Sequence, residues 1–262
     1  MPDVVISIFR LENDRGIFVP EFDIHYLEKE TGIQWFINCG GTRAYFVRIG
    51  SELGSDFEAE CADSHFMANR VVTALFLGGL GLFKLKAMGR MLFENIDFEE
   101  LRFHSHLDLR GIEKEEEKKQ EIDQLTDWYK FICLNNLFRR AADDAYSALL
   151  YPVESSFYIY RGMEWLLRAG NIGWRELAED IGVSFKEIKK FKRTVNVELG
   201  QRHGIDSARK LRAQTRQYGM LVSDFVYGIC KVRKRVDKDY EVPSPKDVSK
   251  IVMKALPIVP YP

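Results

Sequence analysis

The spacing of apolar residues changes once along this chain, and the change limits the folds open to it. Over about the first hundred residues, apolar and polar side chains alternate in short stretches, which is the period of a β-strand. From the charged stretch IEKEEEKKQEIDQ (112–124) onward, apolar residues recur every three or four positions, which is the period of a helix. A sheet-containing part followed by a helical part is therefore expected.

The first part is predicted to be α+β. Its expected strands are VVISIFRLE (4–12), IFVPEFDIHYLE (17–28) and the two halves of IQWFINCGGTRAYFVRIG (33–50). Gly40 and Gly41 are expected to supply the turn between those halves, because glycine tolerates turn backbones. A helix is expected from about Glu58 to Leu77, with Phe66, Val72 and Leu75 pointing inward.

The second part is predicted to be a helical bundle. Its expected helices are 115–150 (stopped by Pro152), 153–169, 174–181, 184–199 and a last long one. The stripe of that last helix is Leu211, Thr215, Tyr218, Val222, Phe225, Ile229, Val232 and Val236. Such a stripe packs along another helix, inside a bundle or across a dimer. We therefore predict an α+β domain at 1–111, a bundle at 112–242 and a proline-rich irregular tail at 243–262.

Charge is unevenly distributed along the chain. The net charge is −1, yet residues 184–238 hold 15 Lys and Arg against 5 Asp and Glu, a net of +10 that leaves −11 for the rest. A basic helical segment attracts phosphate backbones, which makes RNA or a nucleotide the expected partner. The alternative is that this segment faces the acidic half of the same chain, or water.

The remaining motifs exclude several classes of protein. The first residues, MPDVVISIFRLEND, lack the pattern of a secretory signal, and the longest apolar run (71–83) is too short to span a bilayer. The four cysteines form no CxxC pair, so reduced thiols in a cytoplasmic protein are expected. LGGLG lacks the Lys-Ser/Thr of a phosphate-binding loop, and no cofactor is expected.

One stretch has the spacing of a metal site. LRFHSHLDLR (101–110) alternates like a strand, which places His104, His106 and Asp108 on one face. Two imidazoles and a carboxylate bind zinc or iron only if that face lines a cavity. The solvent-exposed side of an amphipathic strand is the commoner setting, and no metal is predicted.

The stretch ELAEDIGVSFKEIKKFKRTVNVELGQRHG (176–204) begins like a helix-turn-helix. Its small residue, turn glycine and two core residues are Ala178, Gly182, Ile188 and Phe191, and Ser184 and Glu187 form a predicted capping box. Phe185 holds the first exposed position of the second helix, where DNA-reading proteins present polar side chains. The exposed cations Lys186, Lys189, Lys190 and Arg193 are expected to contact phosphates and to carry no base information.

The helical part also resembles the HEPN superfamily of helical-bundle proteins. The resemblance rests on YRGME (160–164), on WRELAEDIGV (174–183) ahead of KRTVN (192–196) and GQRHG (200–204), and on helix order over about 125–236. The same layout is similar to the MauJ-type proteins of methylamine-utilisation operons. This resemblance implies an RNA-related role and a homodimer formed through the bundle.

Active members of that superfamily usually carry an Arg, then four to six residues, then a His, and this pair cleaves RNA without a metal. Here the positions at that spacing before His203 hold Glu198, Val197 and Asn196, and none of them is an Arg. Catalysis therefore requires Asn196 or Arg202 to replace the missing Arg. We therefore expect a non-catalytic accessory or RNA-binding protein. The alternatives are a metal-independent endoribonuclease using His203, and a helix-turn-helix DNA-binding protein.

Ordinary structural roles explain the same residues without a substrate. His203 is then bonded to the end of the preceding helix, Asn196 satisfies backbone carbonyls, and Arg161 and Glu164 form an internal ion pair one helical turn apart.

Overall fold

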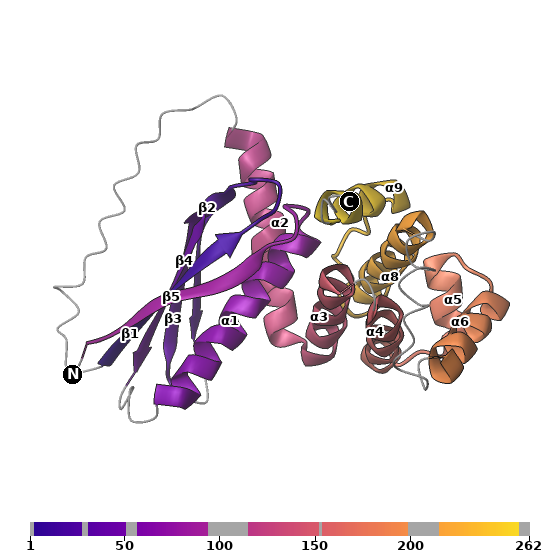
Figure 1. Cartoon of the computed structure of the whole chain (residues 1–262), viewed down its shortest axis with the longest axis horizontal. Helices are drawn as coiled ribbons and strands as arrows, with labels where there is room; N and C mark the ends of the chain where they lie inside the picture. Colours follow the sequence, from indigo (N-terminus) through magenta and orange to yellow (C-terminus); the bar gives the residue numbers. More distant parts are fainter. Residues whose placement is uncertain are drawn as a thin grey trace. The chain divides into compact units, whose positions relative to one another are not determined.

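The structure of the chain is a computed structural model that describes residues 3–27, 31–50, 57–93, 115–151, 154–198 and 215–256. Figure 1 shows a sheet with helical segments beside it, followed along the chain by a group of helices. The described strands all precede the helices of that group. The predicted α+β class is confirmed.

The chain packs into two compact units, which we call the sheet unit and the helical unit. The sheet unit comprises Met1–Val72 and Phe83–Asp127, and the helical unit comprises Thr73–Leu82 and Trp128–Pro262. The chain thus contributes to the helical unit twice. The predicted boundary between residues 111 and 112 lies outside the described residues.

The sheet is antiparallel throughout, in the order β2-β3-β4-β1-β5. Its strands are β1 (Asp3–Glu12), β2 (Val19–Leu27), β3 (Gln34–Gly41), β4 (Arg43–Gly50) and β5 (Lys84–Phe93). The turn between β3 and β4 begins at Gly41, whose φ of 59° is one that glycine adopts at little steric cost. The predicted pair of strands joined at Gly40-Gly41 is confirmed.

The first turns of α1 (Phe57–Leu77) cover one face of the sheet (Figure 1). Ser7 and Ser64 are buried, with their hydroxyl oxygens 2.9 Å apart in a hydrogen bond. The Phe9 ring meets the His65 ring edge-on, with 5.1 Å between centroids. Alternate residues of β1 therefore reach α1, which is the arrangement that its two-residue period dictates.

Two expectations for this part need correction. Phe66 is 40% exposed, so its predicted inward position is wrong, whereas Val72 and Leu75 are buried as predicted. β5 was not predicted, because most of its residues are exposed and its sequence KLKAMGRMLF lacks the alternation that marks a half-buried strand. The strand predicted at 101–110 lies outside the described residues.

The predicted helix over 115–150 is two helices. α2 (Glu115–Leu134) ends before Asn135, and α3 (Asn136–Leu150) follows directly. Asn135 has φ −123° and ψ 85°, and its side-chain amide donates to the Phe131 carbonyl at 2.9 Å. The Asn side chain thus competes with the helical backbone for that carbonyl, a tendency that a periodicity argument does not include.

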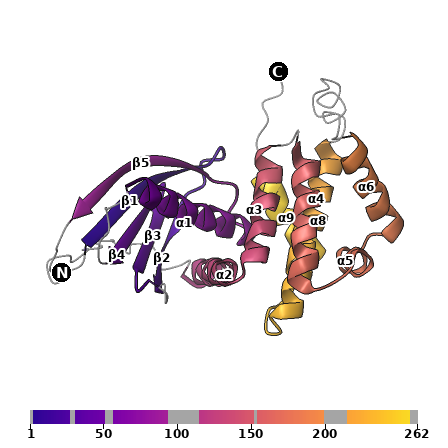
Figure 2. The ribbon, with the colours of Figure 1, turned by 90° about the horizontal axis from the view of Figure 1, so that it is seen from below.

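The later helices follow the prediction more closely. They are α4 (Ser155–Gly170), α5 (Trp174–Ile181), α6 (Phe185–Glu198), α8 (Thr215–Val236) and α9 (Pro245–Ala255). α8 contacts α3, α4, α5 and α9, and α3 and α4 run beside each other (Figure 2). From the predicted stripe Val222, Phe225, Ile229 and Val232 are buried, and Val236 is 48% exposed. These four buried residues therefore pack inside the chain, whereas the stripe is open to solvent at Val236.

The irregular tail predicted from residue 243 is wrong over Pro245–Ala255, which form α9. Ser244 caps this helix by accepting a hydrogen bond from the Asp247 N–H at 3.2 Å. Pro245 occupies the first turn, where a helix needs no N–H donor from it. Val248, Val252 and Ala255 are buried at helical spacing. The abundance of proline masked a short amphipathic helix.

Candidate nucleic-acid interface

Two short helices and a tight turn form the segment predicted as a helix-turn-helix. Gly182, between α5 and α6, has φ 72°, and its N–H donates to the carbonyl of Glu179 at 3.2 Å. This left-handed cap at a helix end is one that glycine adopts readily. The predicted turn glycine is confirmed.

The predicted capping box starts α6. The Ser184 hydroxyl accepts a hydrogen bond from the Glu187 N–H at 3.2 Å, and the Glu187 carboxylate accepts one from the Ser184 N–H at 2.8 Å. Hydrogen bonding to the side chain and then to the backbone of Ser184 lowers the pKa of Glu187 below its usual range. Glu187 therefore carries its charge at the N-terminal end of α6, where the helix dipole favours an anion.

Apolar residues fix the two helices against the rest of the helical unit. The buried members are Leu177, Ala178, Ile181, Ile188 and Val195. Gly228 of α8 lies so close to α5 that a Cβ on Gly228 would be 2.7 Å from Cγ2 of Ile181. The predicted core positions Ala178 and Ile188 are confirmed, and Phe191 is half-buried.

A bidentate ion pair adds a polar link between α5 and α8. Arg235 donates from Nε and one terminal nitrogen to the two carboxylate oxygens of Asp180, at 2.9 and 3.0 Å. The Asp180 side chain is 12% exposed, so this pair is better shielded from water than a typical surface pair. α5, and α6 with it, is thereby fixed in orientation.

The outward side of α6 is cationic. Lys186, Lys189, Lys190 and Arg193 are all exposed, as the sequence predicts. The helix as a whole carries five Lys and Arg against two Glu. Exposed cations at this density interact favourably with a phosphate backbone, since each neutralised phosphate releases condensed counterions.

Aromatic rings lie among these cations. Phe185 is half-buried, with Lys189 Nζ 4.5 Å and the Arg175 guanidinium 5.5 Å from its ring centroid. Lys192 Nζ lies 4.9 Å from the Trp174 centroid, and Trp174 stacks on Tyr160 of α4 with 5.8 Å between centroids. Cation–aromatic contacts therefore join α4, α5 and α6.

Sequence reasoning missed Trp174, Arg175 and Lys192 as members of this surface. Phe185 and Lys189 were recoverable as a pair, because residues four apart lie on one side of a helix. The contact between Trp174 and Lys192 joins two helices and leaves no local signal in the sequence.

Other predicted site residues are not placed. Arg202, His203, His104, His106 and Asp108 lie outside the described residues. Asn196 belongs to the last turn of α6, but its side chain is also outside the description. Within the described ranges, no group of three or more His, Cys, Asp or Glu is arranged to hold a metal ion.

The described cysteines Cys39, Cys133 and Cys230 form no disulfide bond. Cys39 and Cys230 are buried, and Cys133 is partly buried. Burial raises the pKa of Cys230 to about 11 and that of Cys39 further, so both thiols are protonated at neutral pH. These cysteines are therefore poor candidates for nucleophiles.

Known proteins add no further identification. The chain matches no protein-family model, no curated protein and no solved structure. In the described parts of the chain, no helix combines the length and the apolar character needed to cross a bilayer. The HEPN and MauJ-type resemblance stays a prediction.

Proposed function

We propose that this protein is a non-catalytic, HEPN-like accessory protein that binds RNA or a nucleotide through its helical unit. The observation that carries the proposal is the exposed row of Lys186, Lys189, Lys190 and Arg193 on α6. The capped start of α6 and the Asp180–Arg235 ion pair hold that row in place.

The proposed contact is to the phosphate backbone. Lysine is a flexible point charge that neutralises phosphate without reading base edges. Phe185 is half-buried, and Lys189 and Arg175 lie against its ring. The start of α6 therefore has an apolar side chain at the position where a DNA-reading recognition helix presents a polar one. This arrangement supports binding that is independent of sequence over DNA recognition by a helix-turn-helix.

We include Asn196, Arg202 and His203 in the proposed site because they follow the α6 cations along the chain. In the enzymatic alternative, His203 moves the proton of the ribose 2′-hydroxyl and Arg202 or Asn196 steadies the phosphate. The departure from the Arg-to-His spacing of active HEPN nucleases favours binding without cleavage.

The test is binding of a fluorescent mixed-sequence single-stranded RNA over a series of salt concentrations. We expect the double variant Lys189→Glu, Lys190→Glu to bind RNA about tenfold or more weakly. We also expect the salt slope, which is the slope of log affinity against log salt concentration, to become shallower by about two. Lys246→Glu with Lys254→Glu on α9 makes the same change in net charge and is the matched control. Equal affinities for the two double variants would overturn the α6 site.

The same RNA separates the alternatives. Incubation of the wild type and His203→Ala with RNA in EDTA, followed by a gel, detects metal-independent cleavage. Cleavage by the wild type alone makes the protein a nuclease, and intact RNA in both lanes favours the accessory role. A preference for one DNA sequence, lost in Lys189→Glu with Lys190→Glu, supports the helix-turn-helix alternative instead.

We further propose that the protein is cytoplasmic and forms a homodimer through its helical unit. Because Val222, Phe225, Ile229 and Val232 are buried by other helices of the same chain, the dimer has to use a different face. Light scattering on the purified protein measures the mass, and a monomer at all concentrations would contradict the dimer.

A further inference from the structure

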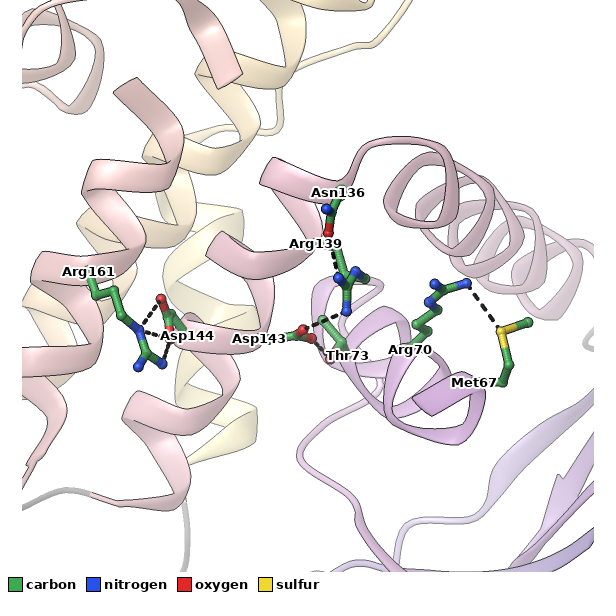
Figure 3. Close-up of polar contacts among 8 residues, drawn as sticks. All are labelled: Met67, Arg70, Thr73, Asn136, Arg139, Asp143, Asp144 and Arg161. Atoms are coloured by element: carbon green, nitrogen blue, oxygen red, sulfur yellow. Dashed lines mark hydrogen bonds and ion pairs between the residues drawn. The ribbon is translucent and has the colours of Figure 1, made fainter. Parts of the chain in front are cut away.

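A buried carboxylate on α3 holds two side chains of α4. Asp144 is 2% exposed, and Arg161 donates from Nε to its two carboxylate oxygens at 3.0 and 3.1 Å (Figure 3). A terminal nitrogen of Arg161 also contacts Asp144, and Trp165 donates a further hydrogen bond to the same carboxylate. One acidic group therefore fixes both a guanidinium and an indole.

Three arginines and three aromatic rings are linked through the two side chains that Asp144 holds. The Arg161 guanidinium lies 5.2 Å from the Phe157 ring centroid and 5.3 Å from that of Tyr158. The guanidinium groups of Arg140 and Arg168 lie 4.7 and 5.2 Å from the Trp165 centroid. We call Arg140, Phe157, Tyr158, Arg161, Trp165 and Arg168 the arginine–aromatic face.

The cations of this face are open to solvent. The Arg161 side chain is 43% exposed despite its ion pair, and Arg140 and Arg168 are exposed. In the described part of the chain, no acidic side chain forms an ion pair with Arg140 or Arg168. The nearby carboxylates Glu154 and Glu164 accept hydrogen bonds from Tyr158 and Tyr160 at 3.2 and 2.8 Å.

Fold stability alone does not explain a carboxylate at this position. Burial raises the pKa of Asp144 even though Arg161 and Trp165 act in the opposite direction, so the charged form is held at a cost. Apolar residues of similar volume often stabilise a core as well as a buried ion pair does. What the carboxylate adds is a fixed orientation for Arg161 and Trp165.

We infer that the arginine–aromatic face is a second phosphate-binding surface, which takes the backbone of single-stranded RNA. This inference rests on the proposed function, since it assigns a further contact for the same ligand. Arg140 and Arg168 lie beside the Trp165 ring and have no ion pair in the described part of the chain, so each guanidinium is able to donate two parallel hydrogen bonds to one phosphate. Cationic surfaces with interleaved aromatic rings are typical of proteins that bind single strands.

The fold connects this face to the α6 cations. Phe157, Arg161, Trp165 and Arg168 follow one another at three- and four-residue steps along α4. Tyr160, on the same helix, stacks on Trp174, which in turn receives Lys192 of α6. Both surfaces belong to the helical unit, so one RNA strand of sufficient length is able to contact both of them.

The test uses the full chain and two double variants. Arg140→Gln with Arg168→Gln removes two exposed charges and leaves the Asp144–Arg161 pair intact. For a mixed-sequence RNA of about 20 nucleotides, we expect an affinity loss of about tenfold and a salt slope lower by about two. Lys246→Gln with Lys254→Gln is the charge-matched control, and we expect it to bind like the wild type.

Comparison with the α6 variant separates this inference from the proposed function. If Lys189→Glu with Lys190→Glu weakens binding but Arg140→Gln with Arg168→Gln does not, the second surface is overturned and the α6 site stands. The reverse result overturns the α6 site and supports the arginine–aromatic face. RNA that fails to bind the wild type overturns both.

A conservative variant tests the role of orientation. Arg161→Lys keeps the positive charge but loses the planar group that bonds Asp144 at two oxygens. We expect RNA affinity to fall about threefold or more with an unchanged salt slope, in a protein whose circular dichroism matches the wild type. Wild-type affinity in Arg161→Lys would show that the stacked geometry is not used.

Discussion

Gly162 of α4 faces the ring of Phe225 of α8 so closely that no side chain fits between them. A Cβ placed on Gly162 would lie 2.8 Å from Cε1 of Phe225, closer than such atoms approach in folded proteins. Both residues are buried. The two helices therefore depend on the absence of a side chain at one position, which the YRGME stretch places between Arg161 and Met163.

We expect Gly162→Ala to destabilise the protein by about 1–3 kcal/mol, since the added methyl group overpacks a filled core. Urea denaturation measures the change. Gly173→Ala is the control, because Gly173 has φ −92° and has room for a methyl group. The atom nearest to a Cβ added there is a carboxylate oxygen of the flexible Glu176 side chain, at 3.6 Å. A Gly162→Ala protein as stable as Gly173→Ala would show that α4 and α8 separate at little cost.

Arg233→Lys is expected to lower the free energy of unfolding by roughly 2 kcal/mol. Arg233 is 1% exposed, and its guanidinium lies 4.4, 4.2 and 3.9 Å from the ring centroids of Trp128, Phe131 and Tyr240. A lysine ammonium cannot stack flat on rings, and it is more strongly hydrated. Arg193→Lys, at an exposed position of α6, makes the same chemical change and is the control; equal losses in both variants would contradict a special role for the three rings.

Arg161→Met should destabilise the protein more than Asp144→Asn at neutral pH. Removal of Arg161 leaves a buried carboxylate without its cation, which costs on the order of 3 kcal/mol, whereas removal of the carboxylate leaves a cation that reaches water. Chemical denaturation of the two single variants measures the difference. If Asp144→Asn destabilises the protein more, burial of the charged Asp144 carboxylate does not cost stability.

The same variant should recover stability as the pH falls. Burial raises the pKa of Asp144, and loss of Arg161 raises it further. A carboxyl whose folded pKa lies above its unfolded value contributes stability at low pH and loses it as the pH rises through the folded pKa. The deficit of Arg161→Met should therefore shrink between neutral pH and about pH 5, and it should not change in Arg161→Met with Asp144→Asn.

The capping box should make α6 sensitive to acid. The folded pKa of Glu187 is lowered by its hydrogen bonds to Ser184, so its contribution is present above the unfolded pKa and is lost as the pH falls through the folded value. Denaturation at neutral pH and below about pH 4 should show a smaller acid loss for Glu187→Gln than for the wild type. Identical acid losses would indicate that the capping carboxylate does not contribute.

Local signals predicted the parts of the fold that depend on neighbouring residues. Gly40-Gly41 predicted the β3–β4 turn, and Gly182 with Ser184 and Glu187 predicted the α5–α6 turn, because each feature acts through backbone geometry within a few residues. The exposed cations of α6 were predictable for the same reason, since helical spacing separates them from Ile188 and Val195.

Features that depend on distant partners were not predictable. Arg161 was expected to pair with Glu164 one turn away, but it pairs with Asp144 of another helix, and Glu164 accepts a hydrogen bond from Tyr160. The break at Asn135 depends on a side-chain bond to the Phe131 carbonyl, which periodicity does not reveal. The arginine–aromatic face combines both problems, because α3 and α4 supply its cations and rings from positions that look unremarkable along the chain.

The two-part origin of the helical unit sets the order in which the chain is able to fold during synthesis. Thr73 donates a hydrogen bond to Asp143 at 2.9 Å (Figure 3), and a Cβ on Gly79 would lie 3.2 Å from Cγ1 of Ile251 in α9. Thr73–Leu82 leave the ribosome long before the residues they pack against. The helical unit therefore closes only when α9 has emerged, and truncation before Pro245 leaves an early-made segment without its late-made partner.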